Sequence, residues 1–376
     1  MKNNRTFLEK LLDGAEVEWK PLKDILIRTK GTKITAAEMK VLHKDNAPLK
    51  IFAGGKTFAL VNFEDIPEKD INKNPSIIVK SRGIIEFEYY DKPFSHKNEM
   101  WSYYSNDKNI NIKYIYYVLK NQEPYFQNLG SKMQMPQIAT PDTDKYLVPI
   151  PPLSVQTKIV KILDALTALT SELTSELTSE LILRQKQYEY YREKLLSFDS
   201  LEQLNSGGGK KKLIDVAKIK NGKDWKHLGE GNIPIYGSGG IMGYVDTYSY
   251  DRPTVLIPRK GSITNIFYLE EPFWNVDTIY YTEIDTTQIL PKYFYHFMKT
   301  VDLAKLDTGS GRPSLTQAIL NEIPIFVPSI EEQHRIVSIL DKFETLTNSI
   351  TEGLPLAIEQ SQKRYEYYRE LLLNFK

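Results

Sequence analysis

The spacing of apolar residues predicts a long helix near the middle of the chain. Leucines recur there at positions 163, 166, 169, 173, 177 and 181. Their mean spacing of 3.6 residues is the period of a straight α-helix, so they form one apolar stripe. A helix of about 43 residues with a single apolar stripe is not stable unless a partner helix covers that stripe.

A second apolar stripe near the C-terminus supplies the partner helix. Its residues are Ile336, Ile339, Leu340, Phe343, Leu346, Ile350 and Leu354. We expect the two helices to lie antiparallel. Gly353 and Pro355 should bend or break the second helix, because proline lacks a backbone N–H and clashes with the preceding turn. Ser154 and Ser329, which follow prolines, should cap the two helices.

Both helical stretches belong to an internal repeat. The hexapeptide YEYYRE occurs at Tyr188–Glu193 and again at Tyr365–Glu370. The same offset of 177 residues relates Ile162-Leu163-Asp164 to Ile339-Leu340-Asp341. A repeat in constant register is one structural unit used twice, which implies a pseudo-twofold molecule. Such symmetry suits a partner with two half-sites, and DNA is the commonest partner of that kind.

The segments that precede the repeated helices are less alike and predict mixed α/β domains. Short β-branched and aromatic runs at Ser76–Val79, Thr254–Pro258 and Thr278–Tyr281 are bounded by turn residues, as strands are. Lys292–Lys299 has helical spacing instead. The glycines and lysines of Ser206–Lys212 suggest a flexible linker between the halves.

These patterns divide the chain into five expected segments. They are a first domain (1–152), a first spacer helix (153–199), a linker (200–212), a second domain (213–328) and a second spacer helix (329–376).

Composition narrows the possible chemistry. The net charge of +1 argues against an indiscriminate polyanion binder, so any DNA-binding face must be a local patch. The absence of cysteine excludes disulfides, thiolate metal sites and a cysteine nucleophile. Charges interrupt Met1–Leu12, which predicts an amphipathic helix rather than a signal peptide, and no apolar run reaches the length of a membrane span. We therefore expect a cytoplasmic protein.

Two duplicated segments carry a family resemblance. They are IPPLSVQTKIVKILD (Ile150–Asp164) with VPSIEEQHRIVSILD (Val327–Asp341), and YEYYREKLL with YEYYRELLL. Together with three TSEL tetrads over Thr170–Leu181, they make the chain resemble the specificity (S) subunits of type I restriction-modification systems. The departures are Gly353 and Pro355, where the first copy has Glu176 and Thr178.

The resemblance implies a fold and a set of partners. The fold is α+β, with two α/β target-recognition domains in pseudo-twofold arrangement, separated by two long antiparallel helices that form a coiled coil. Each domain would read one half of a bipartite sequence in double-stranded DNA. The implied protein partners are methyltransferase (M) subunits, bound in two copies, and restriction (R) subunits. The S subunit would be non-catalytic and bind no cofactor, while S-adenosylmethionine, ATP and Mg²⁺ would serve the partner subunits.

The TSEL tetrads suggest a role in spacing the two half-sites. Each tetrad adds about 6 Å of helix, which is near two base pairs of about 3.4 Å each. A change in the number of tetrads should therefore alter the gap without altering the bases that are read.

Candidate DNA-binding residues lie beside glycines in both halves. Lys80 and Arg82 precede Gly83, and Arg259 and Lys260 precede Gly261, although basic residues at hairpin tips are usually solvated. The loop at 237–243 lacks the order of a nucleotide-binding motif and is either a tight turn near DNA or a plain structural turn. The loop at 309–314 leads into an expected helix N-terminus, where Arg312 is suited to contact phosphate or guanine. The candidates are Lys80, Arg82, Lys132, Gln134, Gln137, Ser238, Arg259, Lys260, Ser310 and Arg312.

Helix residues are candidates for the helix interface and for partner docking. They are Leu163, Leu173, Leu177, Tyr188, Tyr191, Leu340, Phe343, Tyr365 and Tyr368. A role in the core fits the tyrosines better than partner docking does. The five histidines lack the spacing of metal ligands, so no metal site is expected.

Two other classes of protein stay open. One is an enzyme that fuses recognition to its own modification or cleavage, although no adenine-methyltransferase or nuclease motif is present. The other is a free-standing coiled-coil protein that binds DNA or another partner without a methyltransferase.

Overall fold

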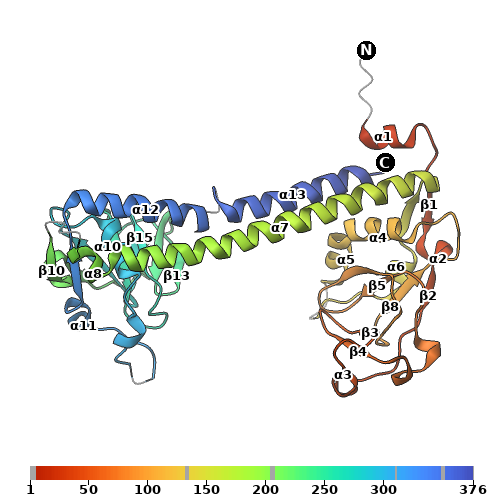
Figure 1. Cartoon of the computed structure of the whole chain (residues 1–376), viewed down its shortest axis with the longest axis horizontal. Helices are drawn as coiled ribbons and strands as arrows, with labels where there is room; N and C mark the ends of the chain where they lie inside the picture. Colours follow the sequence, from red (N-terminus) through yellow and green to blue (C-terminus); the bar gives the residue numbers. More distant parts are fainter. Residues whose placement is uncertain (1–5, 132–134, 204–207, 310, 349–351, 376) are drawn as a thin grey trace, which may run out of the picture. The chain divides into compact units, whose positions relative to one another are not determined.

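The computed structural model describes residues 6–131, 135–203, 208–309, 311–348 and 352–375. They form two compact units (Figure 1). Unit 1 comprises Met1–Thr174 with Glu359–Lys376, and unit 2 comprises Ser175–Ile358. Each unit has its own hydrophobic core.

Unit 1 contains two sheets, a strand pair and short helices. The larger sheet is antiparallel, in the order β2 (Ile27–Thr29), β8 (Trp101–Tyr104), β5 (Ser76–Lys80), β6 (Glu86–Tyr90). The smaller has the order β4 (Phe58–Val61), β3 (Leu49–Phe52), β7 (Phe94–His96), and β1 (Glu18–Pro21) pairs with β9 (Leu147–Ile150). The helices are α1 (Phe7–Leu12), α2 (Leu22–Ile25), α3 (Ala36–Leu42), α4 (Ile112–Asn121), α5 (Glu123–Gly130) and α6 (Thr140–Asp144). Buried residues of α4 and of the larger sheet share one core.

Unit 2 repeats this topology strand for strand. Its larger sheet has the order β11 (Ala217–Lys220), β17 (Ile279–Ile284), β14 (Thr254–Pro258), β15 (Phe267–Leu269). Its smaller sheet has the order β13 (Gly240–Val245), β12 (Ile233–Gly237), β16 (Trp274–Asn275), and β10 (Gly209–Lys212) pairs with β18 (Pro324–Val327). The short helices are α8 (Phe198–Gln203), α9 (Leu213–Val216), α10 (Pro291–Met298) and α11 (Gln317–Asn321). The expectation of two related α/β domains is confirmed.

The strands predicted from apolar runs are present. They correspond to β5, β14 and β17, and every residue of β5 and β14 is buried. A strand covered on both faces is apolar throughout rather than alternating, which is why these runs were recognisable. The predicted helix at Lys292–Lys299 is α10.

The predicted linker (200–212) is wrong at both ends, because residues 200–203 lie in α8 and residues 209–212 form a strand. Lys210–Lys212 lie in β10, a strand that pairs with β18. Lys210 forms an ion pair with Glu202 (2.7 Å) and Lys212 with Glu322 (2.5 Å), so these lysines are engaged locally. Ser206 and Gly207 lie outside the described residues. The domain boundaries drawn from the sequence stay a prediction.

Helix α7 (Leu153–Leu196) contributes its first part to unit 1 and the remainder to unit 2. In unit 1 it packs against the second part of α13 (Leu354–Leu373), where the Thr167 hydroxyl donates to Tyr365 Oη (3.2 Å). In unit 2 it packs against α12 (Ile330–Asn348), where Tyr191 stacks on Phe343. Within each unit the paired segments run in opposite directions, as expected (Figure 1).

The leucine stripe of α7 is only partly buried. Leu163 is fully buried, but Leu169 is 62% exposed and Leu173 is 37% exposed. Thr170 and Thr174 are half-buried in their place. The prediction of one stripe at a period of 3.6 is therefore wrong in the middle of the helix. Paired helices follow a repeat of 3.5 residues, so a straight-helix stripe drifts off the contact face.

The second spacer helix is interrupted, as Gly353 and Pro355 predict. Helix α12 ends at Asn348 and α13 begins at Leu354. Pro355 is the second residue of α13, where its missing N–H costs nothing. Ile350 lies outside the described residues.

The capping prediction is right for one helix and wrong for the other. The Ser329 hydroxyl accepts a hydrogen bond from the Glu332 N–H (3.3 Å) at the start of α12. Ser154 is the second residue of α7 and cannot be its cap. The position that matches Ser329 at the repeat offset is Pro152, whose carbonyl oxygen accepts from the Val155 and Gln156 N–H groups.

The first described residues form the amphipathic helix expected there. Helix α1 begins after Thr6, which forms a capping box with Glu9. Among the described residues, no helix combines the length and apolarity of a membrane span.

A candidate nucleic-acid interface

A short two-stranded ribbon follows β5 in unit 1. We call residues 81–83 with residues 136–138 ribbon 1. The Gly83 N–H donates to the Pro136 carbonyl oxygen (2.9 Å), and the Ile138 N–H donates to the Ser81 carbonyl oxygen (3.0 Å). Arg82 lies opposite Gln137 in this antiparallel bridge. Gly83 has a φ of +79°, a conformation that favours glycine at the turn into β6.

Unit 2 has the same ribbon after β14. We call residues 259–261 with residues 313–315 ribbon 2. The Gly261 N–H donates to the Pro313 carbonyl oxygen (3.0 Å), and the Leu315 N–H donates to the Arg259 carbonyl oxygen (2.8 Å). Lys260 lies opposite Ser314, in the place that Arg82 and Gln137 occupy in ribbon 1.

Each ribbon has an inner and an outer face. Successive residues of an extended chain point to opposite sides. Ser81, Ile138 and Leu315 point inward and are buried. The structure thus places two of the predicted DNA-binding residues, Arg82 and Gln137, side by side on ribbon 1, and a third, Lys260, on ribbon 2 of the other unit, all with exposed side chains.

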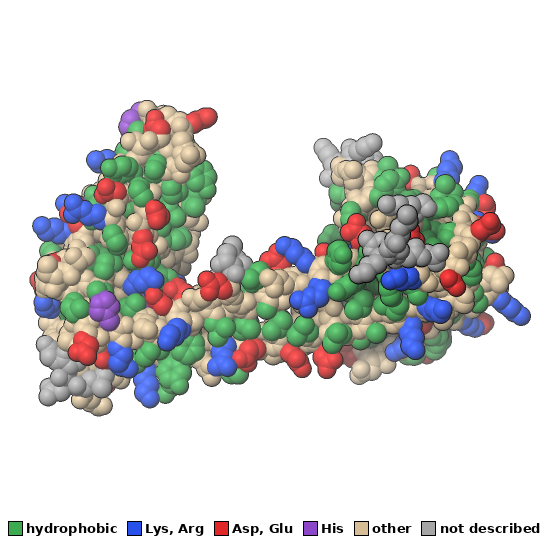
Figure 2. All heavy atoms as spheres, turned by 90° about the horizontal axis from the view of Figure 1, so that it is seen from above, with side chains coloured by type: hydrophobic (Ala, Val, Ile, Leu, Met, Phe, Trp, Pro, Cys, Tyr) green, Lys and Arg blue, Asp and Glu red, His purple; other side chains and the backbone are tan. Residues whose placement is uncertain are grey.

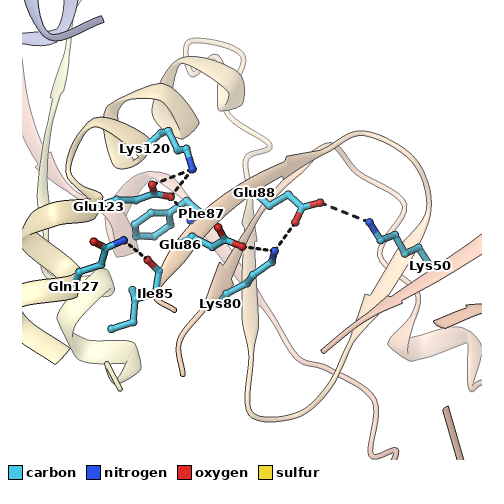
Figure 3. Close-up of polar contacts among 9 residues, drawn as sticks. All are labelled: Lys50, Lys80, Ile85, Glu86, Phe87, Glu88, Lys120, Glu123 and Gln127. Carbon is cyan, nitrogen blue, oxygen red and sulfur yellow. Dashed lines mark hydrogen bonds and ion pairs between the residues drawn. The ribbon is translucent and has the colours of Figure 1, made fainter. Parts of the chain in front are cut away.

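Lys80 is not exposed as a DNA contact would require. It is 6% exposed, and its ammonium lies 2.5 Å from Glu86 and 2.9 Å from Glu88, which also faces Lys50 (Figure 3). Burial alone would lower the pKa of Lys80, but the two carboxylates outweigh burial and raise it. Lys80 therefore carries a compensated charge inside unit 1.

The same part of unit 1 is fixed by neutral and charged contacts from the helices. Glu123 accepts from the Phe87 N–H (2.8 Å) and pairs with Lys120 (2.9 Å) (Figure 3). Gln127 donates to the Ile85 carbonyl oxygen (3.0 Å). These contacts hold β6, and hence the turn that carries ribbon 1, against α4 and α5.

Arg259 and Ser238 support ribbon 2 rather than stand on its outer face. The Arg259 guanidinium is half-buried, lies 5.9 Å from the Tyr280 ring centre and donates to the Asp277 carbonyl oxygen (3.4 Å). The Ser238 N–H donates to Thr278 Oγ1 (3.3 Å), and its carbonyl oxygen accepts from Asn265 (3.0 Å).

The loop before Ser314 is organised by Asp307. Its carboxylate accepts from the N–H groups of Gly309 and Ser314, both at 2.8 Å, and these bonds hold the pKa of Asp307 below its ordinary value. Arg312 is exposed in this loop. Lys132, Gln134 and Ser310 lie outside the described residues.

A comparison with protein families shows which family has this architecture. The family model described as the type I restriction modification DNA specificity domain matches residues 15–182 and again residues 205–360. The chain belongs to this family of type I specificity subunits.

Similar proteins span its whole length. A putative type I restriction enzyme specificity subunit of Haemophilus influenzae is 41% identical, with 100% of each chain covered. The specificity subunit of the type I restriction enzyme EcoR124I/EcoR124II of Escherichia coli is 34% identical, with 98% of this chain and 97% of the other covered.

Solved structures share the fold. One from work on complex assembly and conformational transition of the type I R-M system has a TM-score of 0.68 at 13% identity, covering 96% of this chain and 98% of that chain. A type I S subunit from M. genitalium has a TM-score of 0.54 at 21% identity, covering 97% and 98%.

Several residues at the ribbons were not predicted from the sequence. Ile84, 65% exposed, follows Gly83, and the exposed Met135 places its sulfur 3.1 Å from Arg82 Nε. Ser314 was also missed, although it matches Gln137 at the repeat offset of 177. That offset is a signal that could have found it.

The candidate helix residues divide into two groups. Leu163, Leu340 and Tyr188 are buried, and Leu177, Phe343 and Tyr365 are half-buried. The exposed members are Leu173, Tyr191 and Tyr368. The first group packs within the units, and the second group leaves apolar surface on the helices.

A polar cluster anchors α10 to α12. His296, fully buried, lies 2.9 Å from Asp341 Oδ1, and Lys292 donates to Asp341 Oδ2 (2.8 Å). His296, Asp341 and Glu344 bring possible metal-ligand atoms within 4.8 Å of one another, but Lys292 and Tyr295 already hydrogen-bond the two carboxylates. In unit 1, Tyr117 and Lys113 make the matching contacts to Asp164.

On the face of the molecule seen in Figure 2, the surface charge is mixed rather than polarised. Coloured Lys and Arg side chains are interspersed there with Asp and Glu. This agrees with the net charge of +1 and leaves specific contacts, rather than a broad basic field, to position DNA.

Proposed function

We propose that this specificity subunit reads a bipartite DNA sequence, with unit 1 reading one half and unit 2 the other. The observation that carries the proposal is the duplicated ribbon: the same backbone frame presents Arg82 and Gln137 in one unit and Lys260 and Ser314 in the other. A repeated frame with different outward side chains is what two different half-sites require.

The partners follow from the family and from a repeated surface. Two exposed tyrosine pairs, Tyr190 with Tyr191 and Tyr367 with Tyr368, lie in identical hexapeptides, and both pairs have ring centroids 5.4 Å apart. The same surface presented twice suits two copies of one partner. We assign it to two methyltransferase subunits, with restriction subunits joining the complex.

In this proposal the chain itself does no chemistry. S-adenosylmethionine, ATP and Mg²⁺ serve the methyltransferase and restriction subunits, and this chain supplies the sequence preference. The expected location is the cytoplasm, where these partners and the DNA meet.

The test is co-expression with a candidate methyltransferase subunit, followed by single-molecule sequencing of methylated adenines in the host DNA. We expect a bipartite motif with a fixed gap. A continuous motif, or methylation without sequence preference, would contradict the proposal. Failure to form any complex would favour the free-standing coiled-coil protein.

A further inference from the structure

We propose that ribbons 1 and 2 enter the major groove, and that the opposed pair on each outer face selects bases of one half-site. The pairs are Arg82 with Gln137 and Lys260 with Ser314. The inference rests on the proposed function and names the residues that would carry it.

The first support is shape. The major groove admits a two-stranded β-ribbon, whose side chains then reach the base edges. Each ribbon is fixed from behind, because Ile138 and Leu315 are buried in the cores of their units. A rigid backbone holds the outward side chains in one geometry, as base discrimination requires.

The second support is the chemistry of the outward side chains. Arginine forms a fork that matches O6 and N7 of guanine, and the glutamine amide matches N6 and N7 of adenine. Met135 contacts Arg82 Nε at 3.1 Å and so orients the guanidinium. The exposed Ile84 at the adjacent turn suits the methyl group of thymine. In ribbon 2, Lys260 suits guanine and the Ser314 hydroxyl suits several bases.

The third support is the local charge. A loop that binds phosphate gathers several cations, but Lys260 has Asp277 at 3.8 Å. In ribbon 1, burial would raise the pKa of Glu99, but a hydrogen bond from Lys97 and, to a smaller extent, the charge of Arg82 lower it. Such partly compensated cations favour directional contacts with base edges over general attraction to the backbone.

The experiment measures binding of the purified complex with methyltransferase subunits to DNA duplexes. The duplexes carry the target found for the wild type, with each base pair of both halves replaced in turn. For the Arg82→Ala/Gln137→Ala variant we expect discrimination to fall about tenfold or more at one or two positions of one half. The other half should be read as before, and Lys260→Ala/Ser314→Ala should give the mirrored result.

Arg82→Lys keeps the charge but loses the fork, so it should also lose discrimination if Arg82 reads a base. Arg82→Lys also keeps the inference testable if the double variant does not fold. Uniformly weaker binding with discrimination intact in both halves would overturn the inference, because it would make these side chains phosphate contacts. A wild-type complex that shows no bipartite preference would instead overturn the proposed function.

Discussion

Single buried glutamines tie each long helix to its unit. Gln156 is fully buried, accepts from the Asn111 N–H (2.9 Å) and donates to the carbonyl oxygens of Asn109 (3.0 Å) and Pro151 (2.8 Å). Gln333 makes the same three contacts in unit 2, to Leu290, Gln288 and Pro328. The internal repeat pairs the two glutamines, but only the structure shows that each one hydrogen-bonds backbone groups at the start of α4 or α10.

Gln156→Leu should lower the free energy of unfolding by about 3 kcal/mol, because three backbone groups lose the hydrogen-bond partner that the glutamine supplies. Gln333→Leu should have a similar effect, and urea denaturation of the purified chain measures both. Exposed Gln185 provides the matched control, for which Gln185→Leu should change stability by less than about 0.5 kcal/mol. Equal effects of the buried and exposed replacements would refute the conclusion that Gln156 and Gln333 tie the long helices to their units.

Asp341 should make stability depend on pH. Burial would raise its pKa, but hydrogen bonds from His296 and Lys292 outweigh burial and hold the pKa below its ordinary value. A depressed carboxyl pKa adds stability above the unfolded value of about 3.9, and this contribution is lost as pH falls through the folded pKa. Asp341→Asn should therefore cost about 1–2 kcal/mol at pH 7, discounted for partial exposure.

The difference between the wild type and Asp341→Asn should shrink as the pH falls below about 4. Urea denaturation midpoints at pH 7 and below about pH 4 measure this difference. The control is Asp224→Asn, which replaces an exposed carboxyl. A difference that stays constant with pH would mean that the ion pair does not supply the stability.

At the scale of elements, periodicity predicted where helices and buried strands lie but not which helix face makes contact. The runs at β5 and β14 were clear because both faces of each strand are covered. On α7, Leu169 and Leu173 were expected to face a partner helix and instead lie exposed. The spacing of the leucines does not show how two helices wind about each other, so the sequence did not indicate that Thr170 and Thr174 lie on the contact face.

The break between α12 and α13 gives a prediction about an element. A Cβ on Gly353 would lie 2.7 Å from the Thr345 carbonyl oxygen and 2.8 Å from that of Leu346. Gly353→Ala must therefore shift backbone and should cost roughly 1–3 kcal/mol in urea denaturation. Gly54→Ala is the control, since a Cβ there meets nothing within 4 Å. If Gly353→Ala proves neutral, the close approach at this break is not required.

At the scale of the whole molecule, the repeat predicted the duplicated domains, while the site was predicted only in part. Arg82 and Lys260 were selected because they neighbour glycines, and Gln137 because it follows the counterpart of the loop at 309–314; the structure places Arg82 opposite Gln137 in ribbon 1 and Lys260 in ribbon 2. Lys80 satisfied the same sequence rule but is enclosed by Glu86 and Glu88. Sequence alone does not give the inward or outward direction at the end of a buried strand, and function depends on that direction.

The TSEL tetrads give the prediction for the whole molecule. Deleting Thr174–Leu177 removes about 6 Å of α7 and turns its continuation by about 40°. One base pair of DNA advances about 3.4 Å and turns about 35°. The length therefore corresponds to about two base pairs and the rotation to about one, so the gap in the methylated motif should shorten by one or two base pairs. The bases read should stay the same, because the deletion leaves both ribbons unchanged.

The length-neutral variant Ser175→Ala should keep the parental gap. Sequencing of methylated DNA from cells that carry each variant decides the matter, and a deletion that still methylates the parental spacing would show that α7 does not set the gap.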